Sequence, residues 1–231
     1  MDRAPRLADP RLALITLLGF ASGLPLLLTA FTLGQWLTES RVPLALIGLT
    51  ANVGIAYSLK FLWAPLMDAA RPPPPFGRLG RRRGWLFATQ AALLAATVAL
   101  ALSNPARAAL ATIALAALVA FCSASQDIMI DAWRIETFPP RLQGAAMAGY
   151  VWGYRVAMLV SGSGAIALAS FWGWHGSLLA MAALTLLGPA ATLLAAEPHA
   201  GGRLRPLRGW RREVAQALRA PLADMLARPG A

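Results

Sequence analysis

The chain has 231 residues, of which 58% are hydrophobic and 13% are charged, and its mean hydropathy is +0.56. A soluble domain carries about a quarter of charged residues, so this composition excludes an ordinary soluble protein and indicates a membrane protein. The formal net charge of +11 does not indicate nucleic-acid binding, because the arginines lie between apolar runs and no stacking aromatic residues interleave with them.

Apolar runs of about 20 residues, the length at which a helix crosses a bilayer, recur along the chain. The sequence predicts six membrane-spanning helices, at residues 12–36, 44–63, 85–102, 108–130, 143–171 and 176–196. We therefore expect an all-α membrane protein in which residues 1–196 form a six-helix bundle within the lipid bilayer. Residues 197–231 are basic, with apolar positions at helical spacing, which predicts an amphipathic helix on the membrane surface or a solvated linker helix.

The distribution of cationic residues predicts the orientation. Arginines of the N-terminal segment, of the loops after the second and fourth spans and of the tail fall on one side of the membrane, 17 in all. The opposite side has only Arg41 and Arg107. Because cytoplasmic loops collect Lys and Arg, we expect both ends of the chain to be cytoplasmic.

Small residues mark the first and fifth spans. Gly19, Ser22, Gly23 and Pro25 occur within the first apolar run. They indicate either a broken helix beside a cavity or a proline kink with small-residue packing against a neighbouring helix. In the fifth span small residues recur at every fourth position, which predicts close approach of another helix: Ala145, Gly149, Gly153, Ala157, Ser161 and Ala165.

Charged residues inside the spans are the candidates for proton coupling and translocation. Asp127 and Asp131 lie one helical turn apart on one face of the fourth span. A carboxylate inside a membrane helix costs roughly 2.5–3.5 kcal/mol on insertion scales, so it usually faces a water-filled cavity or a partner charge. Lys60 and Arg155 are the candidate partners. Alternatively, Lys60 extends to the membrane surface and Asp131 pairs locally with Arg134.

The loop after the second span contains an acidic residue followed by a Gly-Arg-Arg-type cluster. These residues are Asp68, Gly80, Arg81, Arg82 and Arg83. They resemble a stretched form of the signature loop of the major facilitator superfamily. Further stretches, in order along the chain, are residues 19–26 (GFASGLPL), 58–68 (SLKFLWAPLMD), 80–90 (GRRRGWLFATQ), 125–134 (SQDIMIDAWR) and 153–162 (GYRVAMLVSG). Together they resemble the AmpG-type muropeptide permeases of that superfamily, a branch that also contains the acetyl-coenzyme A transporters.

This resemblance implies about twelve helices in two homologous halves, each built from three-plus-three inverted repeats. The six predicted spans correspond to the N-terminal half. The expected partner is therefore a missing C-terminal half or a second copy of the chain. A fragment, a frameshifted gene and a natural half-transporter stay open as explanations.

The resemblance also implies proton-coupled import of anhydro-muropeptides across the bacterial inner membrane, in support of peptidoglycan recycling. Neutralising Asp127 or Asp131 would weaken its hold on Lys60 or Arg155 and bias the change between outward and inward states. Arg155 could otherwise face anionic groups of the substrate. Polar residues expected to bond the sugar are Gln35, Asn52, Tyr57, Gln126 and Tyr154. The arginine-rich loop is expected to control gating.

Other functions are transport of a different anionic conjugate, such as acetyl-coenzyme A, and a non-transporting membrane sensor or assembly factor. An intramembrane aspartyl protease needs two carboxylates that face each other from different helices, whereas Asp127 and Asp131 share one. The sequence contains no Ser/His, Cys/His or zinc-ligand constellation. We therefore expect no enzyme activity, no metal and no cofactor.

Overall fold

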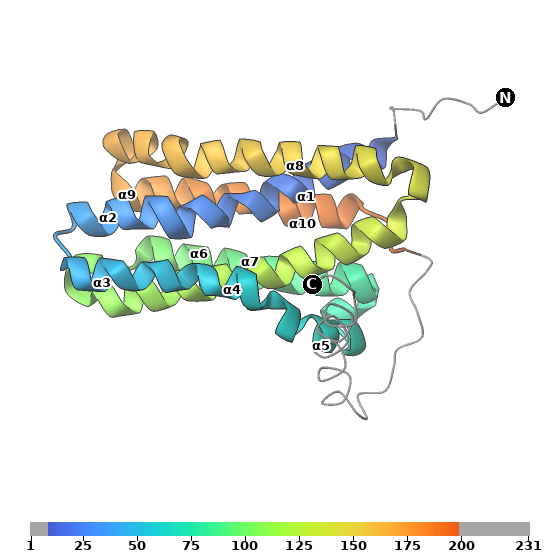
Figure 1. Ribbon diagram of the computed structural model, residues 1–231, viewed down its shortest axis with the longest axis horizontal. Helices are drawn as coiled ribbons and strands as arrows, with labels where there is room; N and C mark the ends of the chain where they lie inside the picture. The colour runs from blue at the N-terminus through green and yellow to red at the C-terminus, as the bar shows by residue number, and fades with distance from the viewer. Residues whose placement is uncertain (1–8, 199–231) are drawn as a thin grey trace, which may run out of the picture.

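The computed structural model describes residues 9–198, which form helices joined by short turns, with no strand in that range. The long helices lie along one common direction as an elongated bundle (Figure 1). The tail for which an amphipathic helix was predicted lies outside the described residues from position 199 onward.

The first crossing is an uninterrupted rod over Pro10–Glu39. It consists of α1 (Pro10–Leu27), a π-helical turn η1 (Leu28–Thr32) and α2 (Leu33–Glu39). The helix continues past Pro25, so the broken-helix interpretation is wrong. The second crossing is less regular and consists of α3 (Leu44–Leu49), η2 (Thr50–Gly54), α4 (Ile55–Leu59) and η3 (Lys60–Leu62). It is barely buried within the bundle.

Two short helices, α5 (Ala64–Ala69) and η4 (Phe76–Leu79), lead to the third crossing, α6 (Arg81–Leu102). The fourth crossing is α7 (Pro105–Thr137), which is kinked at Ala108. The next segment contains η5 (Pro140–Leu142), α8 (Gln143–Leu159), a second π-helical turn η6 (Val160–Gly164), α9 (Ala165–Thr185) and α10 (Leu187–Leu194).

Five segments are long and apolar enough to cross a membrane, and the last of them, Pro140–Leu194, has 55 residues. That segment reverses at Gly173, whose φ of 70° and ψ of 170° are not helical. The Ser177 hydroxyl donates to the Ala165 carbonyl oxygen, a contact that a straight helix cannot make across twelve positions. The described chain therefore makes six crossings.

The helices extend beyond the predicted spans at the arginine-rich end. Arg81, Arg82 and Arg83 form the first turn of α6 rather than a loop. α7 continues seven residues past Ile130 and ends at Thr137. Phe138 is extended, the conformation that a following proline favours, and Pro139 follows it. The apolar run thus marks the membrane-embedded part of α7, and the proline that follows Phe138 sets the end of the helix.

The first and fifth crossings pack at very short range. A Cβ atom added at Gly19 would overlap the backbone oxygen of Tyr150, and one added at Gly153 would overlap that of Thr16. Ala157 and Ser161, further along the predicted stripe of small residues, are fully buried. The prediction of small-residue packing is confirmed.

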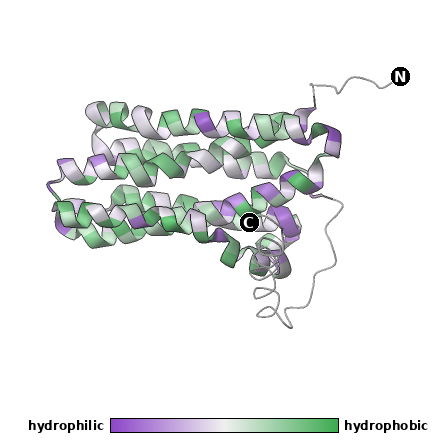
Figure 2. Cartoon of the chain, in the orientation of Figure 1, coloured by the Kyte–Doolittle hydropathy of each residue, from purple (hydrophilic) through white to green (hydrophobic). Residues whose placement is uncertain are grey.

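Large apolar side chains cover the outside of the bundle, among them Leu44, Phe171 and Leu194. Figure 2 shows hydrophilic residues gathered at one end, beside α5, while the sides of the bundle are largely hydrophobic. An apolar exterior of membrane-spanning length is what a bilayer covers. The chain is a multi-pass membrane protein.

Candidate functional site

The Asp127 carboxylate is the point at which four crossings meet. Asp127 lies on α7 and is 5% exposed. The Ser22 hydroxyl, on α1, donates to Asp127 Oδ1, and Lys60 Nζ, at the start of η3, lies 3.6 Å from Asp127 Oδ2. The Tyr150 hydroxyl, on α8, lies 2.8 Å from Ser22 Oγ. Residues from α1, α7, α8 and the second crossing therefore share one polar cluster inside the apolar bundle.

The direction of hydrogen bonding in this cluster follows from valence. A serine hydroxyl has one hydrogen, and an ionised carboxylate only accepts. Since Ser22 donates to Asp127, Tyr150 must donate to Ser22 Oγ. The chain of donors thus runs from Tyr150 through Ser22 to Asp127. With Lys60 as counter-charge, this is the arrangement of an ionised Asp127.

The structure separates the two aspartates that the sequence placed together. Asp131 has a 43% exposed side chain, and its Oδ1 lies 3.5 Å from Arg134 Nη2, three residues along the same helix. Asp131 therefore forms the local ion pair with Arg134 that was one alternative. Asp127 forms the expected pair between Lys60 and a carboxylate of the fourth crossing.

Arg155 does not pair with either aspartate, so of the two interpretations of Arg155 the internal ion pair is wrong. It lies on α8 and is exposed, and it forms no ion pair within the described residues. Instead it lines a groove between the first and fifth crossings, next to Tyr154.

The five polar residues expected to bond a sugar fall into two groups. Gln126 is fully buried, and neither its amide atoms nor the Tyr57 hydroxyl has a hydrogen-bond partner in the part of the chain described. The Tyr154 ring lies 6.0 Å from the ring of Tyr150. By contrast, Gln35 and Asn52 are exposed, and Gln35 Nε2 donates to Glu39 at 3.0 Å.

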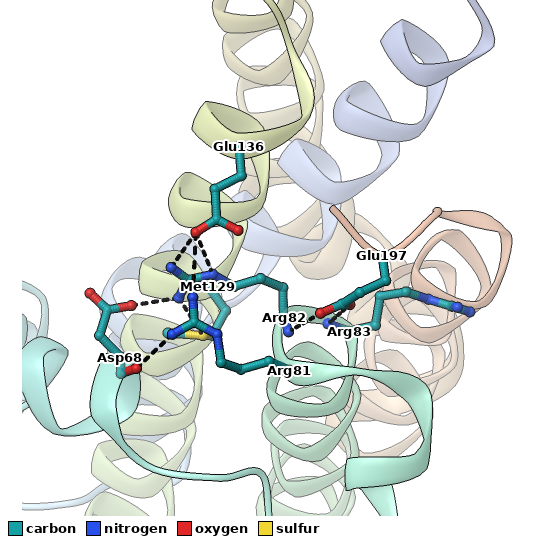
Figure 3. Close-up of polar contacts among 7 residues, drawn as sticks. All are labelled: Asp68, Arg81, Arg82, Arg83, Met129, Glu136 and Glu197. Carbon is teal, nitrogen blue, oxygen red and sulfur yellow. Dashed lines mark hydrogen bonds and ion pairs between the residues drawn. The ribbon is translucent and has the colours of Figure 1, made fainter. Parts of the chain in front are cut away.

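A second polar cluster joins the arginine-rich helix ends (Figure 3). The guanidinium group of Arg82, nearly buried, donates to the carboxylates of Asp68 and Glu136. Arg81 donates from Nη1 to the Asp68 backbone oxygen at 2.8 Å, and its Nη2 lies 3.6 Å from Glu136 Oε1. The cluster therefore ties α5 and the end of α7 to the start of α6.

The third arginine takes part in a reciprocal cap between α6 and α10, and Figure 3 shows the contacts of Glu197 in it. Glu197 accepts from the backbone N–H groups of Arg82 at 2.8 Å and Arg83 at 3.0 Å. The Arg83 side chain donates to the backbone oxygens of Thr192 and Leu193, the last turn of α10. Both contacts complement the partial charges of the helix ends.

Gly80 makes this cap possible. Its φ is 104°, a left-handed value that glycine tolerates, and a Cβ there would overlap the Glu197 carboxyl group. Gly80 and the three arginines were singled out from the sequence as a loop, but Glu197 was not.

Sequence reasoning missed four residues of the two clusters: Ser22 and Tyr150 as polar contacts, and Glu136 and Glu197. One signal was available for Tyr150, because Tyr150 and Tyr154 are four residues apart and share one face of a helix. Glu197 was available as the acidic residue nearest the end of the sixth apolar run, and Glu136 as the next acidic residue after Asp131 beyond the fourth.

The chain is similar in sequence to known membrane transporters. The chain is 51% identical over 191 residues to the anhydromuropeptide permease of Escherichia coli K12, which covers 82% of this chain and 38% of that protein, within its N-terminal half. It is 41% identical over 78% of its length to an uncharacterised protein of Haemophilus influenzae, and 38% identical over 71% to AmpG 4 of Rickettsia conorii, named as a transporter.

The chain spans between 38% and 42% of the length of these three relatives. Its six crossings correspond to one six-helix half of a major facilitator fold. The Major Facilitator Superfamily matches residues 15–229, nearly the whole chain. By this match and by its all-helical membrane architecture, the chain belongs to the major facilitator superfamily of transporters.

Proposed function

We propose that the chain forms one half of a secondary active transporter that imports anhydro-muropeptides, the sugar-peptide products of cell-wall turnover. Transport would be proton symport by alternating access across the bacterial inner membrane, with both ends of the chain in the cytoplasm, and would support peptidoglycan recycling. The observation that carries this proposal is the buried Asp127 carboxylate, held by Ser22 and Lys60 from two other crossings. The similarity to the E. coli permease supports the substrate class.

Asp127 can couple a proton to a change of shape. A proton on the carboxylate removes the counter-charge of Lys60 and leaves Ser22 bonded to a neutral group. The second crossing, which carries Lys60, is barely buried within the bundle, so few other contacts fix its position. Protonation would therefore shift the balance between states in which this crossing is attached to α7 and states in which it is released. Gln126, Tyr57 and Tyr154 would supply hydrogen bonds to the sugar.

The cluster of Asp68, Arg81 and Arg82 with Glu136 supports a gating role for the arginine-rich end. It joins α5, α6 and α7 through charge-assisted hydrogen bonds. Asp68 lies on α5, which follows the second crossing along the chain, so movement of that crossing would change the contacts of Asp68 with α6. The cluster would thus stabilise one of the two transport states over the other.

Uptake by cells tests the proposal. The chain is expressed in E. coli that lacks its own permease, alone or together with the C-terminal half of the E. coli permease, and uptake of radiolabelled anhydro-muropeptide is measured. Uptake by the chain alone would assign the second half of the transporter to a second copy. Uptake only with the added half would assign it to a C-terminal partner.

Two comparisons make this experiment specific. Dissipating the proton gradient must abolish the uptake, and excess acetyl-coenzyme A must leave it unchanged. Absence of uptake in both forms, from chains shown to be in the membrane, would overturn the proposed function.

A further inference from the structure

A groove lies between the first and fifth crossings, where each of them contains a π-helical turn. Its volume is about 880 Å³, within the range of roughly 300–1,000 Å³ that small-molecule sites occupy. Leu27 and Phe31 line one wall, and Val151, Met158 and Leu159 line the other. The groove is therefore large enough for part of a sugar-peptide and is mostly apolar.

Arg155 is the one charged residue among those that line the groove. It lies near the middle of the fifth crossing and is exposed, with no ion pair within the described residues. The other described arginines lie near the ends of the crossings. A cation at this depth is costly, which makes a lone arginine there a mark of a ligand or ion pathway.

The two π-helical turns shape the groove. Phe31 belongs to η1, while Gly162 and Ser163 belong to η6. The Thr32 hydroxyl on η1 donates to the Ser161 backbone oxygen on η6, which fixes the two turns side by side. Such turns are rare and occur frequently at functional sites. The two π-helical turns on one groove therefore indicate a functional site independently of the charge of Arg155.

The groove adjoins the Asp127 cluster through two tyrosines on α8. Tyr154 lines the groove, and its ring lies 6.0 Å from that of Tyr150. Tyr150 in turn bonds Ser22, which bonds Asp127. A ligand in the groove would therefore lie within a few side chains of the carboxylate that the proposed coupling uses.

We propose that this groove is the subsite for a carboxylate of the substrate's peptide and that Arg155 binds it. This inference rests on the proposed function and names the part of the substrate that the groove recognises. The guanidinium fork can donate two parallel hydrogen bonds to one carboxylate, and the apolar walls can contact nonpolar groups of the peptide. An anionic lipid headgroup is a poorer match, because headgroups lie at the membrane surface and Arg155 lies near mid-depth.

Binding of a matched pair of ligands tests the subsite. The full chain is reconstituted in phosphatidylcholine nanodiscs, alone and with the C-terminal half of the E. coli permease. Affinities are measured for an anhydro-muropeptide with free carboxylates and for the same molecule with its carboxylates amidated. The wild-type chain is expected to prefer the free form by about 10- to 100-fold, the effect of a hydrogen-bonded charge pair.

Arg155→Gln is expected to abolish this preference with little effect on the amidated ligand, and Arg155→Lys to retain part of it. Arg107→Gln, a change at another exposed arginine, is the control and must keep the full preference. If the wild-type chain binds both ligands equally, or Arg155→Gln keeps the preference, the subsite is refuted while the proposed function stands. If the wild-type chain binds neither ligand in either form, the proposed function itself fails.

Discussion

Lys60 and Asp127 form an ion pair of 3.6 Å whose two members differ in their access to solvent. The side chain of Lys60 is 34% exposed and that of Asp127 only 7%. Removing Asp127 leaves a lysine that can extend to the surface, whereas removing Lys60 leaves a buried carboxylate without its counter-charge. Substitution of Asp127 and substitution of Lys60 are therefore expected to have different effects.

Asp127→Asn is expected to fold and to lose proton-driven uptake by about tenfold or more, because the amide cannot take up and release the proton. Asp131→Asn is the matched control on the same helix. It is expected to keep most of the uptake, because the side chain of Asp131 is 43% exposed and its one ion pair among the described residues is the local one with Arg134. Uptake is measured against external pH in the form of the protein that transports. Equal loss in both variants would contradict the separate roles of the two aspartates.

Lys60→Gln is expected to destabilise the bundle by about 1–3 kcal/mol, since it leaves Asp127 unpaired. Adding Asp127→Asn to this variant is expected to recover part of that loss, because the double variant has no buried charge at the site. Unfolding of the two single variants and the double variant in detergent gives the coupling energy. Additive effects would show that the ion pair does not hold the second crossing to α7.

Arg82→Met is expected to cost about 3–5 kcal/mol of stability, because it removes the nearly buried guanidinium group that pairs with the largely buried carboxylate of Glu136. The lost contact with Asp68 adds little, since the side chain of Asp68 is 54% exposed. Arg82→Lys should recover little of this loss, since the single ammonium nitrogen of lysine cannot reproduce the spacing of the guanidinium nitrogens that reach the two carboxylates.

Arg78→Met is the control for this pair, because Arg78 is exposed and makes no ion pair in the described part of the chain. Thermal unfolding in detergent micelles gives the comparison. A loss as large in Arg78→Met as in Arg82→Met would contradict the role assigned to Arg82.

Glu197→Gln is expected to weaken the cap at the start of α6 by about 0.5–2 kcal/mol. The backbone amides of Arg82 and Arg83 should then exchange hydrogen faster, while amides in the middle of α6 should not change. Gly80→Ala should have a larger effect, because a Cβ at φ 104° is strained and overlaps Glu197. Gly77→Ala, where the nearest atom lies 3.8 Å away, is the control. Unchanged exchange at both amides would exclude the cap.

The number of crossings could be predicted from the sequence because the thickness of the bilayer sets the length of each apolar run that crosses it. The helix ends could not, since they depend on polar contacts outside the apolar runs. Arg81 begins a helix because Gly80 and Glu197 cap it, and α7 continues to Thr137 because the first proline lies beyond it. The pairing of Lys60 with Asp127 was one of two interpretations, and the structure selects it.

The other contacts of the site depend on which helices are neighbours, and a single sequence does not give that information. Pairing with an aspartate was one of two interpretations of Arg155, and the position of α8 places this residue on the wall of the groove instead. Ser22 was interpreted only as a small residue of the first crossing, and its role as a donor depends on Asp127 and Tyr150 arriving from α7 and α8. Glu197 acquires its role only because α10 ends beside the start of α6.

The glycines between α1 and α8 change the meaning of alanine scanning in this protein. Alanine is usually chosen as the substitution that takes atoms away, but at Gly19, Gly23 and Gly153 it would push apart two backbones that touch. A scan would then score these positions as severely as substrate contacts, although they contribute no functional group. At Gly34 and Gly48 no atom beyond the adjoining helix backbone lies within 4 Å of the added carbon, so the same substitution there measures only helix propensity. Loss of transport on changing a glycine of this chain must therefore be compared with the space available at that glycine before it is attributed to the substrate pathway.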